Sequence, residues 1–230
     1  MPTTTPRFSA DTLRFLRALE RNNRREWFNA HRDDYEAYVR QPMTAIVERL
    51  AVDLRAFAPE LIASPKVSMY RIYRDTRFSD NKTPYKTHVA AVFPTRGLLK
   101  HEGAGVYFHI SPEEVWIGGG MYSPQASQLH AVREHIAGHM KQLRAIVESP
   151  GFRTHLGTLE GETLKRVPRG FPNDHPAAEY LKFRQFLAGA EFSPALATRP
   201  AFYKTLLTVF RQVTPLTRFL NAPLLKGRDS

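Results

Sequence analysis

The segment of residues 70–88 holds the side chains best suited to chemistry. Five cations are interleaved there with aromatic and small polar residues: Arg71, Arg74, Arg77, Lys82 and Lys86. A core strand excludes so many charges, because a buried cation needs an anionic partner. Guanidinium and ammonium groups that converge with backbone donors bind phosphates and carboxylates. The segment therefore predicts a shaped, positively charged site, with surface cations on an ordinary hairpin as the alternative.

A polar turn at residues 78–84 is expected to present these cations. Serine, aspartate and asparagine side chains bond to their own backbone in turns, and Pro84 fixes φ. Aromatic side chains of the segment are expected to stack on a ring attached to the bound anion. The predicted ligand-binding residues of the segment are Arg71, Tyr73, Arg74, Arg77, Phe78, Ser79, Asn81, Lys82 and Lys86.

Acid–base chemistry has three candidates in the same segment. His88 is the first, because the ordinary histidine pKa of about 6.5 suits proton transfer; alternatively, it is a strand histidine on the solvent face. Asp75 is the second, unless it is the salt-bridge partner of Arg71 or Arg74. Tyr85 is the third, as a proton donor.

Two further features belong to the predicted site. A strand-like segment contains three consecutive glycines: Gly118, Gly119 and Gly120. They mark either the floor of a pocket or a bulge under a packed aromatic such as Trp27. A second basic loop contains Arg169 and ends at a helix start, where an anion can bind. Capping of that helix by Asp174 is the simpler role for the loop.

No metal or cofactor site is predicted. His135 and His139 lie four residues apart on an expected helix, a spacing that can ligate a metal, but no third ligand accompanies them. The glycine loops that bind nucleotides and the serine-hydrolase motif are absent. The lack of cysteine excludes disulfides, thiol catalysis and cysteine-bound metal.

Charge and hydropathy narrow the class of partner. The net charge of +11 and the pI near 10.1 favour an anionic small molecule or nucleotide, with nucleic acid as the alternative. No apolar run reaches the roughly 18 residues that span a bilayer. Residues 1–7 lack the apolar region of a secretory signal. A cytoplasmic protein without a membrane partner is therefore expected, and no oligomeric state is predicted.

Apolar periodicity and turn residues predict the elements of the chain. Helices are expected over residues 9–22, 23–57 with an interruption at Pro42, 123–147 with a break near Gly138, and 193–220. Strands are expected at residues 66–74, 87–93, 105–111, 115–122 and 183–192. Residues 111–114 are expected to join a hairpin, and residues 150–175 to be irregular.

This order of helices, closely spaced strands and helices predicts an α+β fold. The strands follow one another too closely for helical crossovers, so they are expected to pair antiparallel. We expect one domain over residues 9–220, with a central, mainly antiparallel sheet and the N- and C-terminal helices packed on it. Residues 1–8 are expected to form a flexible arm and residues 221–230 a frayed tail.

Several segments carry a resemblance to a known family. They are Phe15-Leu16-Arg17-Ala18-Leu19, Asn23-Arg24-Arg25-Glu26-Trp27-Phe28, Tyr73-Arg74-Asp75-Thr76-Arg77-Phe78-Ser79, Asn81-Lys82, Pro84-Tyr85-Lys86, Gly118-Gly119-Gly120-Met121-Tyr122, Pro168-Arg169-Gly170-Phe171 and Asp174-His175-Pro176. Over residues 10–220 the sequence resembles a widespread family of uncharacterised bacterial and fungal proteins, classed as a domain of unknown function. The resemblance implies that these segments belong to one domain, and it brings no established activity.

Three functions fit these residues. The first is binding of a phosphate-bearing or other anionic ligand, a nucleotide or similar, at the basic and aromatic segment. The second is an enzyme that acts on an anionic substrate at the same site, with Asp75 or His88 as the acid or base. The third is an architectural Arg–Asp–Tyr network in a protein-interaction module, pinned to the helical layer through Trp27 and Glu26. We favour the first.

Overall fold

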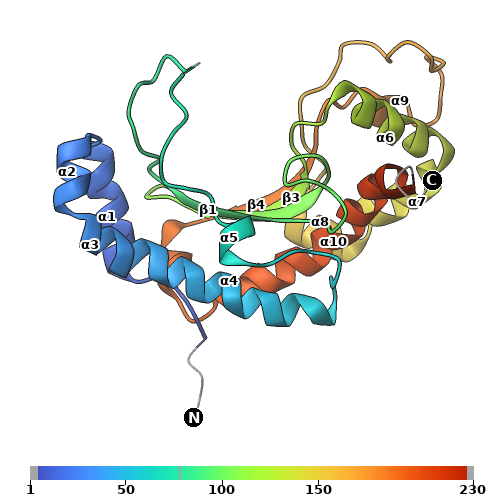
Figure 1. Ribbon diagram of the computed structural model, residues 1–230. Coiled ribbons are helices and arrows are strands. Elements are labelled where there is room, and N and C mark those ends of the chain that lie inside the picture. Colours follow the sequence, from blue (N-terminus) through green and yellow to red (C-terminus); the bar gives the residue numbers. More distant parts are fainter. Residues whose placement is uncertain (1–4, 78, 227–230) are drawn as a thin grey trace.

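Four antiparallel strands form one sheet whose spatial order follows the sequence. A computed structural model describes residues 5–77 and 79–226. The strands are β1 (Val89–Pro94), β2 (Gly105–Ile110), β3 (Val115–Met121) and β4 (Phe186–Phe192), in the order β1-β2-β3-β4. Helices pack on this sheet, so the predicted α+β fold with a central antiparallel sheet in a single domain is confirmed (Figure 1).

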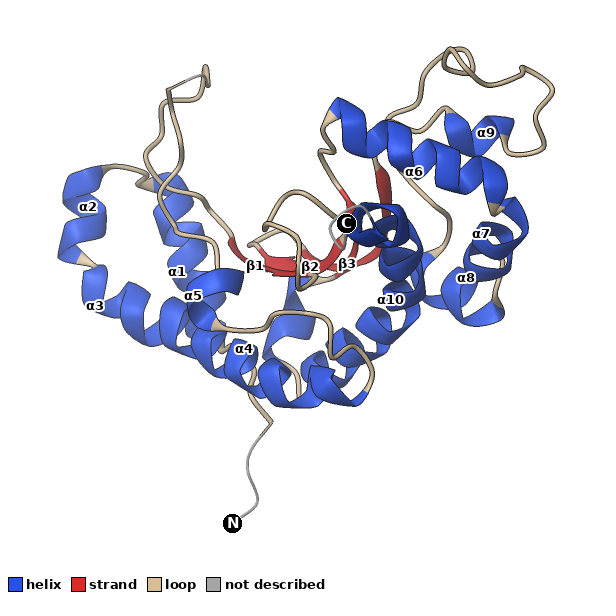
Figure 2. Ribbon diagram, turned by 45° about the vertical axis from the view of Figure 1, so that its right-hand side comes forward, coloured by secondary structure: helices blue, strands red, loops and turns tan. Residues whose placement is uncertain are grey.

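The helices fall into an N-terminal and a C-terminal group. The N-terminal group comprises α1 (Ala10–Arg21), α2 (Arg25–Ala30), α3 (Arg32–Tyr35), a π-helical turn (Glu36–Arg40), α4 (Gln41–Asp53), a 3-10 turn (Leu54–Ala56) and α5 (Pro65–Ser68). The C-terminal group comprises α6 (Ala126–Gly138), α7 (Met140–Val147), α8 (Pro150–Leu156), α9 (Ala178–Leu181), a 3-10 turn (Pro194–Thr198) and α10 (Phe202–Lys226). Figure 2 shows both groups around the strands.

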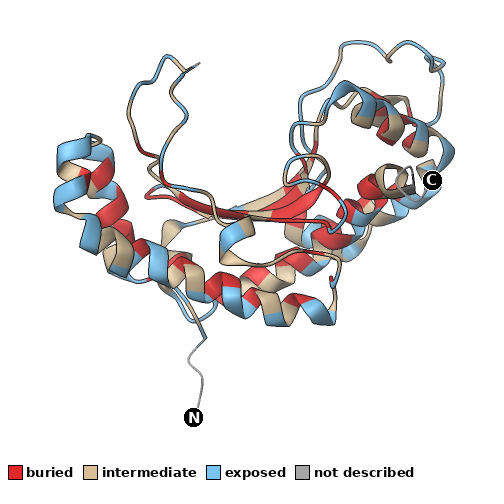
Figure 3. Cartoon of the chain, viewed as in Figure 1, coloured by how far each residue is buried: buried red, intermediate tan, exposed pale blue. Residues whose placement is uncertain are grey.

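The hydrophobic core lies between α10 and one face of the sheet. Side chains alternate between the two faces of a strand, and the apolar residues of β2 all fall on the α10 side. Phe108 contacts the rings of Phe202 and Phe210, and Phe93 of β1 also meets Phe210. These rings are fully buried, and Figure 3 shows burial concentrated between the sheet and α10. Helix α10 thus covers one face of the sheet.

The opposite face of the sheet lies between two arms. One arm is the hairpin of residues 71–88, which rises beside α1 and α2; the other comprises α6, α9 and the loop of residues 157–177 (Figure 1). In the part of the chain that the structure describes, no helix lies flat on this face (Figures 1 and 2). We call it the open face.

The strand predicted at residues 66–74 is wrong. Residues 65–68 form α5, because Pro65 suits a first helical turn and the Ser64 hydroxyl accepts a hydrogen bond from the amide of Val67. The following residues are extended but make only single bridges, Met69 with Ala91 and Tyr73 with Tyr85. This stretch therefore carries the hairpin arm instead of a sheet strand.

Three further boundaries differ from expectation. Residues 150–156, predicted as irregular, form α8 behind the cap of Ser149. Helix α10 continues through Lys226, because the Asn221 side chain is buried and bonded to both backbone groups of Ala104, so residues 221–226 are not frayed. Phe8 is buried against Phe202, so the core begins within the predicted arm.

Most of the remaining predictions of local structure agree with the fold, but the helix expected over residues 23–57 is also divided at His31, between α2 and α3. The hairpin of β2 and β3 turns at Ser111, whose hydroxyl accepts hydrogen bonds from the amides of Glu113 and Glu114. Strand β4 is an edge strand, and the predicted helix break falls at His139, between α6 and α7. Among the described residues, no helix has both the length and the apolar character to cross a membrane.

Candidate functional site

A cavity of about 950 Å³ lies on the open face of the sheet. Its floor is formed by Tyr107, His109 and Trp116, which alternate along β2 and β3 with the core residues. Its walls include side chains from the hairpin arm, from the loop after β1 and from the segment after β3: Tyr70, Lys86, His88, Lys100, Tyr122 and Gln125. We call this cavity the sheet pocket.

The glycines of β3 accommodate a tryptophan ring at the floor of the sheet pocket. A methyl group at Gly118, or at Gly189 opposite it on β4, would overlap the indole of Trp116. The pairing of β3 is regular on both sides, so the glycines do not form a bulge. The packed aromatic is Trp116 and not Trp27, which stacks on His31 of the segment after α2 with ring centroids 4.1 Å apart.

The neighbouring glycines line the cavity itself. Gly119 and Gly120 both border the sheet pocket. Gly120 has a φ of 127°, a conformation that side-chain-bearing residues rarely adopt. The predicted pocket floor therefore coincides with a real cavity, although the residue beside these glycines is Lys86 rather than the whole arginine cluster.

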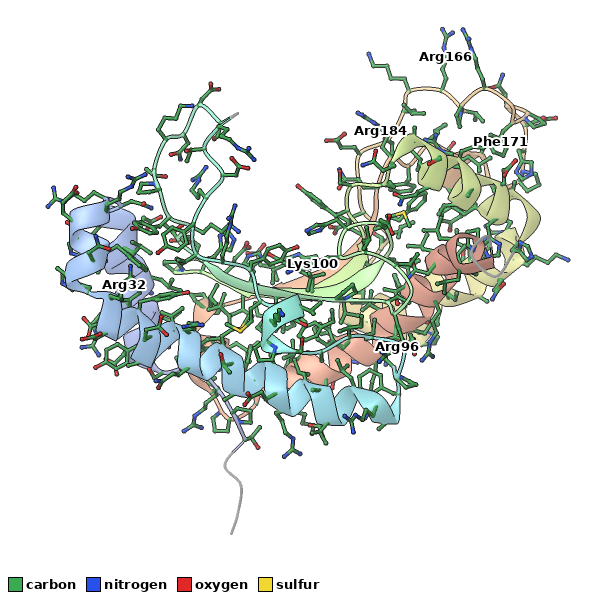
Figure 4. The ribbon with its side chains drawn as sticks, in the orientation of Figure 1. Arg32, Arg96, Lys100, Arg166, Phe171 and Arg184 are labelled. Atoms are coloured by element: carbon green, nitrogen blue, oxygen red, sulfur yellow. The ribbon has the colours of Figure 1, made fainter. Side chains whose placement is uncertain are left out.

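Two lysines converge on one aromatic ring at the wall of the sheet pocket. The ammonium groups of Lys86 and Lys100 lie 5.0 Å and 4.2 Å from the centroid of the Tyr70 ring. Burial lowers the pKa of both lysines; Arg71 and Arg74 lower that of Lys86 further, and Lys86 lowers that of Lys100. Figure 4 shows Lys100 at the open face of the sheet, between the arms.

Neither lysine has a carboxylate partner. Lys100 Nζ lies 3.4 Å from the carbonyl oxygens of Ser68 and Met69, which are neutral acceptors. Among the described residues, no ion pair includes Lys86 or Lys100. The wall therefore presents two positive charges that the protein itself does not neutralise.

A chain of hydrogen bonds runs along the floor of the sheet pocket. His109 Nε2 lies 2.9 Å from a carboxylate oxygen of Glu114, and its Nδ1 lies 3.1 Å from the hydroxyl of Tyr107. Because the carboxylate only accepts, we assign the proton to Nε2, so that Nδ1 accepts from the tyrosine. Burial raises the pKa of the Tyr107 hydroxyl, which keeps it protonated.

His88 lies next to His109, a member of this hydrogen-bonded chain of side chains. Its ring centroid lies 5.5 Å from that of His109, and both imidazoles line the sheet pocket. Burial lowers the pKa of His88 to about 4, with smaller contributions from His109, Lys86 and Arg74. His88 is therefore a neutral imidazole at pH 7, which can accept a proton or a hydrogen bond inside the cavity.

A second, smaller cavity of about 440 Å³ collects other predicted residues. It lies between α2 and the hairpin arm and is lined by Arg25, Asn29, Tyr73, Arg74, Thr76, Lys82, Pro84 and Tyr85. We call it the hairpin pocket. The structure thus divides the predicted segment: Tyr73, Arg74 and Lys82 meet in the hairpin pocket, whereas Lys86 belongs to the sheet pocket.

The base of the hairpin arm is fixed to the helical layer. The Asn23 side chain donates to the carbonyl of Tyr85 at 2.9 Å and accepts from its amide at 3.0 Å. The Tyr85 ring is buried and stacks on Phe28 with centroids 4.1 Å apart. The residues that pin the arm are therefore Asn23 and Phe28, and not Trp27 and Glu26 as the architectural hypothesis stated.

The remaining predicted residues that the structure describes line neither cavity. Arg71 and Arg77 are exposed, and Arg77 donates two side-chain hydrogen bonds to Asp75, at 3.0 and 2.8 Å. These bonds are the main cause that lowers the pKa of Asp75 to about 2, and the charge of Arg71 makes a smaller contribution. Ser79 and Asn81 lie at the tip of the arm, and Phe78 lies outside the described residues.

Two features lie on the opposite arm. Arg169 is exposed on the loop there, close in sequence to Arg166, which Figure 4 shows at the end of that arm. His135 and His139 have ring centroids 4.2 Å apart, but the described residues contain no cluster of three or more side chains able to hold a metal ion. Neither feature reaches the sheet pocket.

Sequence reasoning missed several side chains that line the sheet pocket, namely Tyr70, Lys100, His101, Tyr107, His109 and Trp116. It also missed Glu114, which bonds to His109. One signal was present, because the alternation in residues 105–110 places Tyr107 and His109 on the face opposite Phe108. Because α10 covers only the Phe108 face of the sheet, the aromatic and titratable residues on the opposite face are candidates for ligand binding.

Comparison with known proteins identifies a family and nothing more specific. The family model described as "Conserved hypothetical protein (DUF2461)" matches residues 11–219. No curated protein and no solved structure matches the chain. The match covers both arms and the sheet between them.

Proposed function

We propose that the sheet pocket binds an anionic ligand with a planar ring, such as a nucleotide or a similar phosphate-bearing molecule. The chain belongs to this family of conserved hypothetical proteins. The observation that carries the proposal is the pair Lys86 and Lys100, whose ammonium groups share the Tyr70 ring without a carboxylate partner.

Bringing two cations together in a partly buried wall disfavours their charged forms. A ligand anion between Lys86 and Lys100 would reverse that penalty, since each ammonium would gain an opposite charge. Charge-assisted hydrogen bonds of this kind contribute about 1.5–3 kcal/mol each. The anion is therefore expected at the wall formed by the hairpin arm and the loop after β1.

The floor of the sheet pocket suits the planar part of the ligand. One side of the Trp116 indole lies over the glycines, and the ring borders the cavity together with Tyr107. A stacked base or similar ring contributes about 1–3 kcal/mol on such a surface. The volume of about 950 Å³ is at the upper end of the roughly 300–1,000 Å³ typical of small-molecule pockets.

A thermal-shift screen of nucleotides and phosphosugars tests the proposal. A ligand of the sheet pocket raises the melting temperature of the wild type. Lys100→Gln is expected to weaken its binding by about 10- to 100-fold, since one charge-assisted contact is lost. Arg166→Gln removes an equal charge from the far end of the opposite arm and is the matched control.

The position of the ligand is read from fluorescence. The chain has two tryptophans, so Trp27→Phe leaves Trp116 as the only indole. Quenching of that indole on titration places the ring at the floor of the sheet pocket. A screen without any shift, or an equal loss of binding in Arg166→Gln, would contradict the proposal.

The lowered pKa values of the two lysines give the proposal a pH signature. Anion affinity requires the protonated ammonium, so affinity falls as pH rises through the lysine pKa. Because burial lowers the pKa of Lys86 and Lys100, the decline is expected at a pH below 10.5. Isothermal titration of the ligand found in the screen, from pH 7 to pH 10, measures this decline.

A second candidate function is acid–base catalysis on the same ligand. It is favoured by the hydrogen bonds that link Tyr107, His109 and Glu114. The imidazole can take the Tyr107 proton at Nδ1 while the tyrosine oxygen takes a proton from a hydroxyl of the ligand, and the carboxylate at Nε2 then stabilises the imidazolium. His109 would be the base and Glu114 the residue that orients it. This places the acid–base role on residues other than Asp75 and Tyr85.

Turnover separates this candidate from binding alone. Glu114→Gln keeps a hydrogen-bond acceptor near His109 but removes the charge that stabilises the imidazolium. If the pocket is catalytic, this variant binds the screened ligand normally and converts it at least about 100-fold more slowly. Recovery of the intact ligand after prolonged incubation with wild-type protein limits the function to binding.

A further inference from the structure

The hairpin pocket concentrates positive charge in a small volume. Arg25 reaches it from α2, whereas Arg74 and Lys82 come from the two sides of the hairpin arm. The residues that line it include no aspartate or glutamate. Three cations thus border about 440 Å³, compared with two lysines in the sheet pocket, which has more than twice that volume.

Neutral partners hold two of these cations, Arg74 and Lys82, without cancelling their charge. Arg74 donates to the Thr83 hydroxyl at 3.3 Å, and Lys82 donates to the carbonyl of Thr76 at 3.0 Å. Among the described residues, no ion pair includes Arg25, Arg74 or Lys82. The cations are therefore ordered and available to an external anion.

The nearest acidic residue of the arm is committed elsewhere. Asp75 follows Arg74 directly, but its carboxylate accepts both side-chain hydrogen bonds of Arg77 and does not line the hairpin pocket. Local pairing with Arg77 thus leaves Arg74 unneutralised. An arrangement in which Asp75 bonded Arg74 would have closed this pocket to anions.

From these contacts we propose that the hairpin pocket is a separate phosphate-binding site, which takes the phosphate group of a small phosphorylated molecule. Guanidinium groups pair with phosphate oxygens in a bidentate manner, and Lys82 adds a point charge. Asn29 and Thr76 line the same cavity and supply polar side chains for the remaining oxygens. Tyr73 forms an aromatic wall for the rest of the molecule.

The site is built in advance on a rigid base. Asn23 fixes the backbone of Tyr85 on both its amide and its carbonyl, and the Tyr85 ring is stacked on Phe28. Preorganised donors reduce the entropy lost on binding. Tyr85 borders the hairpin pocket, whereas the next residue, Lys86, borders the sheet pocket. The arm is thus a wall shared by two sites, and the hairpin site does not depend on the function proposed for the other.

Titration calorimetry with inorganic phosphate tests this site on the full chain. Arg74→Gln and Arg25→Gln are each expected to weaken binding by about 10-fold or more, because a charge-assisted contact is lost. Arg71→Gln removes an equal charge from the same arm outside both pockets and is expected to retain wild-type affinity within about twofold. Lys100→Gln alters only the sheet pocket, so it is expected to leave unchanged the binding that Arg74→Gln and Arg25→Gln weaken, whether or not phosphate also binds in the sheet pocket. Sulfate and chloride titrations at matched ionic strength separate binding from screening.

The outcomes divide cleanly between the two pockets. Loss of a binding component in Arg74→Gln and Arg25→Gln but not in Arg71→Gln supports the hairpin site, whatever the nucleotide screen and Lys100→Gln show. Loss in Lys100→Gln alone assigns the phosphate to the sheet pocket and overturns the proposal. Equal weakening in Arg71→Gln, or no heat of binding in the wild type, also overturns it. The side chains changed are at least partly exposed, and urea unfolding of each variant verifies that it folds.

Discussion

The two faces of the sheet are made from alternate residues of the same strands, yet they follow different rules. On one face the buried Phe108 lies among the rings of Phe202 and Phe210. On the other, Tyr107 and His109 form hydrogen bonds along the floor of an open cavity. Because α10 supplies the apolar burial on the first face, the second face is free to carry titratable groups.

The largest expected difference between the two faces is the loss of unfolding free energy when one side chain on each face is shortened. Phe108→Ala leaves a cavity in a fully buried cluster and is expected to cost about 3–5 kcal/mol of unfolding free energy. Tyr107→Phe removes only a hydroxyl on the open face, so its cost is expected to be about 1 kcal/mol. Urea unfolding followed by circular dichroism measures both. Similar losses in the two variants would mean that the open face also supports the fold.

The glycines that lie against Trp116, Gly118 and Gly189, offer a second test with an intermediate expected loss of stability. Gly189→Ala places a methyl group where the indole lies and is expected to cost about 1–3 kcal/mol, while changing the near-UV signal of Trp116. Gly138→Ala is the control, since a methyl group there, at the end of α6, contacts nothing within 4 Å. An unchanged indole signal in Gly189→Ala would show that Trp116 does not depend on these glycines.

His88 should give the smallest effect, visible only through pH. Burial lowers its pKa in the folded state to about 4, so below pH 6.5 the unfolded chain binds a proton that the folded chain does not. The wild type is therefore expected to lose stability relative to His88→Gln between pH 6.5 and pH 4, by about 1–2 kcal/mol after allowance for partial exposure. Chemical unfolding of both proteins across this range measures the difference.

If the pH dependence of stability in His88→Gln follows the wild type, the His88 imidazole is more hydrated in the folded protein than its burial indicates.

Local signals predicted much of the fold. The β2–β3 hairpin follows from alternating apolar residues on both sides of a Ser-Pro turn, and all of these features lie within residues 105–121. Residues 66–74 were mistaken for a strand, because β-like composition cannot reveal whether a partner strand lies alongside. Ser64 and Pro65, a cap followed by a first-turn proline, were the local evidence for the helix found there.

Only part of the candidate site was predicted from the sequence. Lys86, His88, Gly119 and Gly120 do line the sheet pocket, but the residues between them in space come from β2, β3 and the loop after β1. Their convergence depends on which face α10 covers, a tertiary choice that composition does not encode. The pairing of Asp75 with Arg77, rather than with Arg74, likewise depended on the geometry of the turn.

Helix α10 has a consequence for the order in which the chain matures during synthesis. Its side chains cover the apolar face of β2 and β3. These strands leave the ribosome more than 80 residues before α10 does. Until residues 202–220 emerge, Phe93 and Phe108 lack their main cover, and so does Phe8 from the start of the chain. Such long-range closure delays folding and leaves a nascent chain prone to association, so chaperone dependence should concentrate in the last stage of translation.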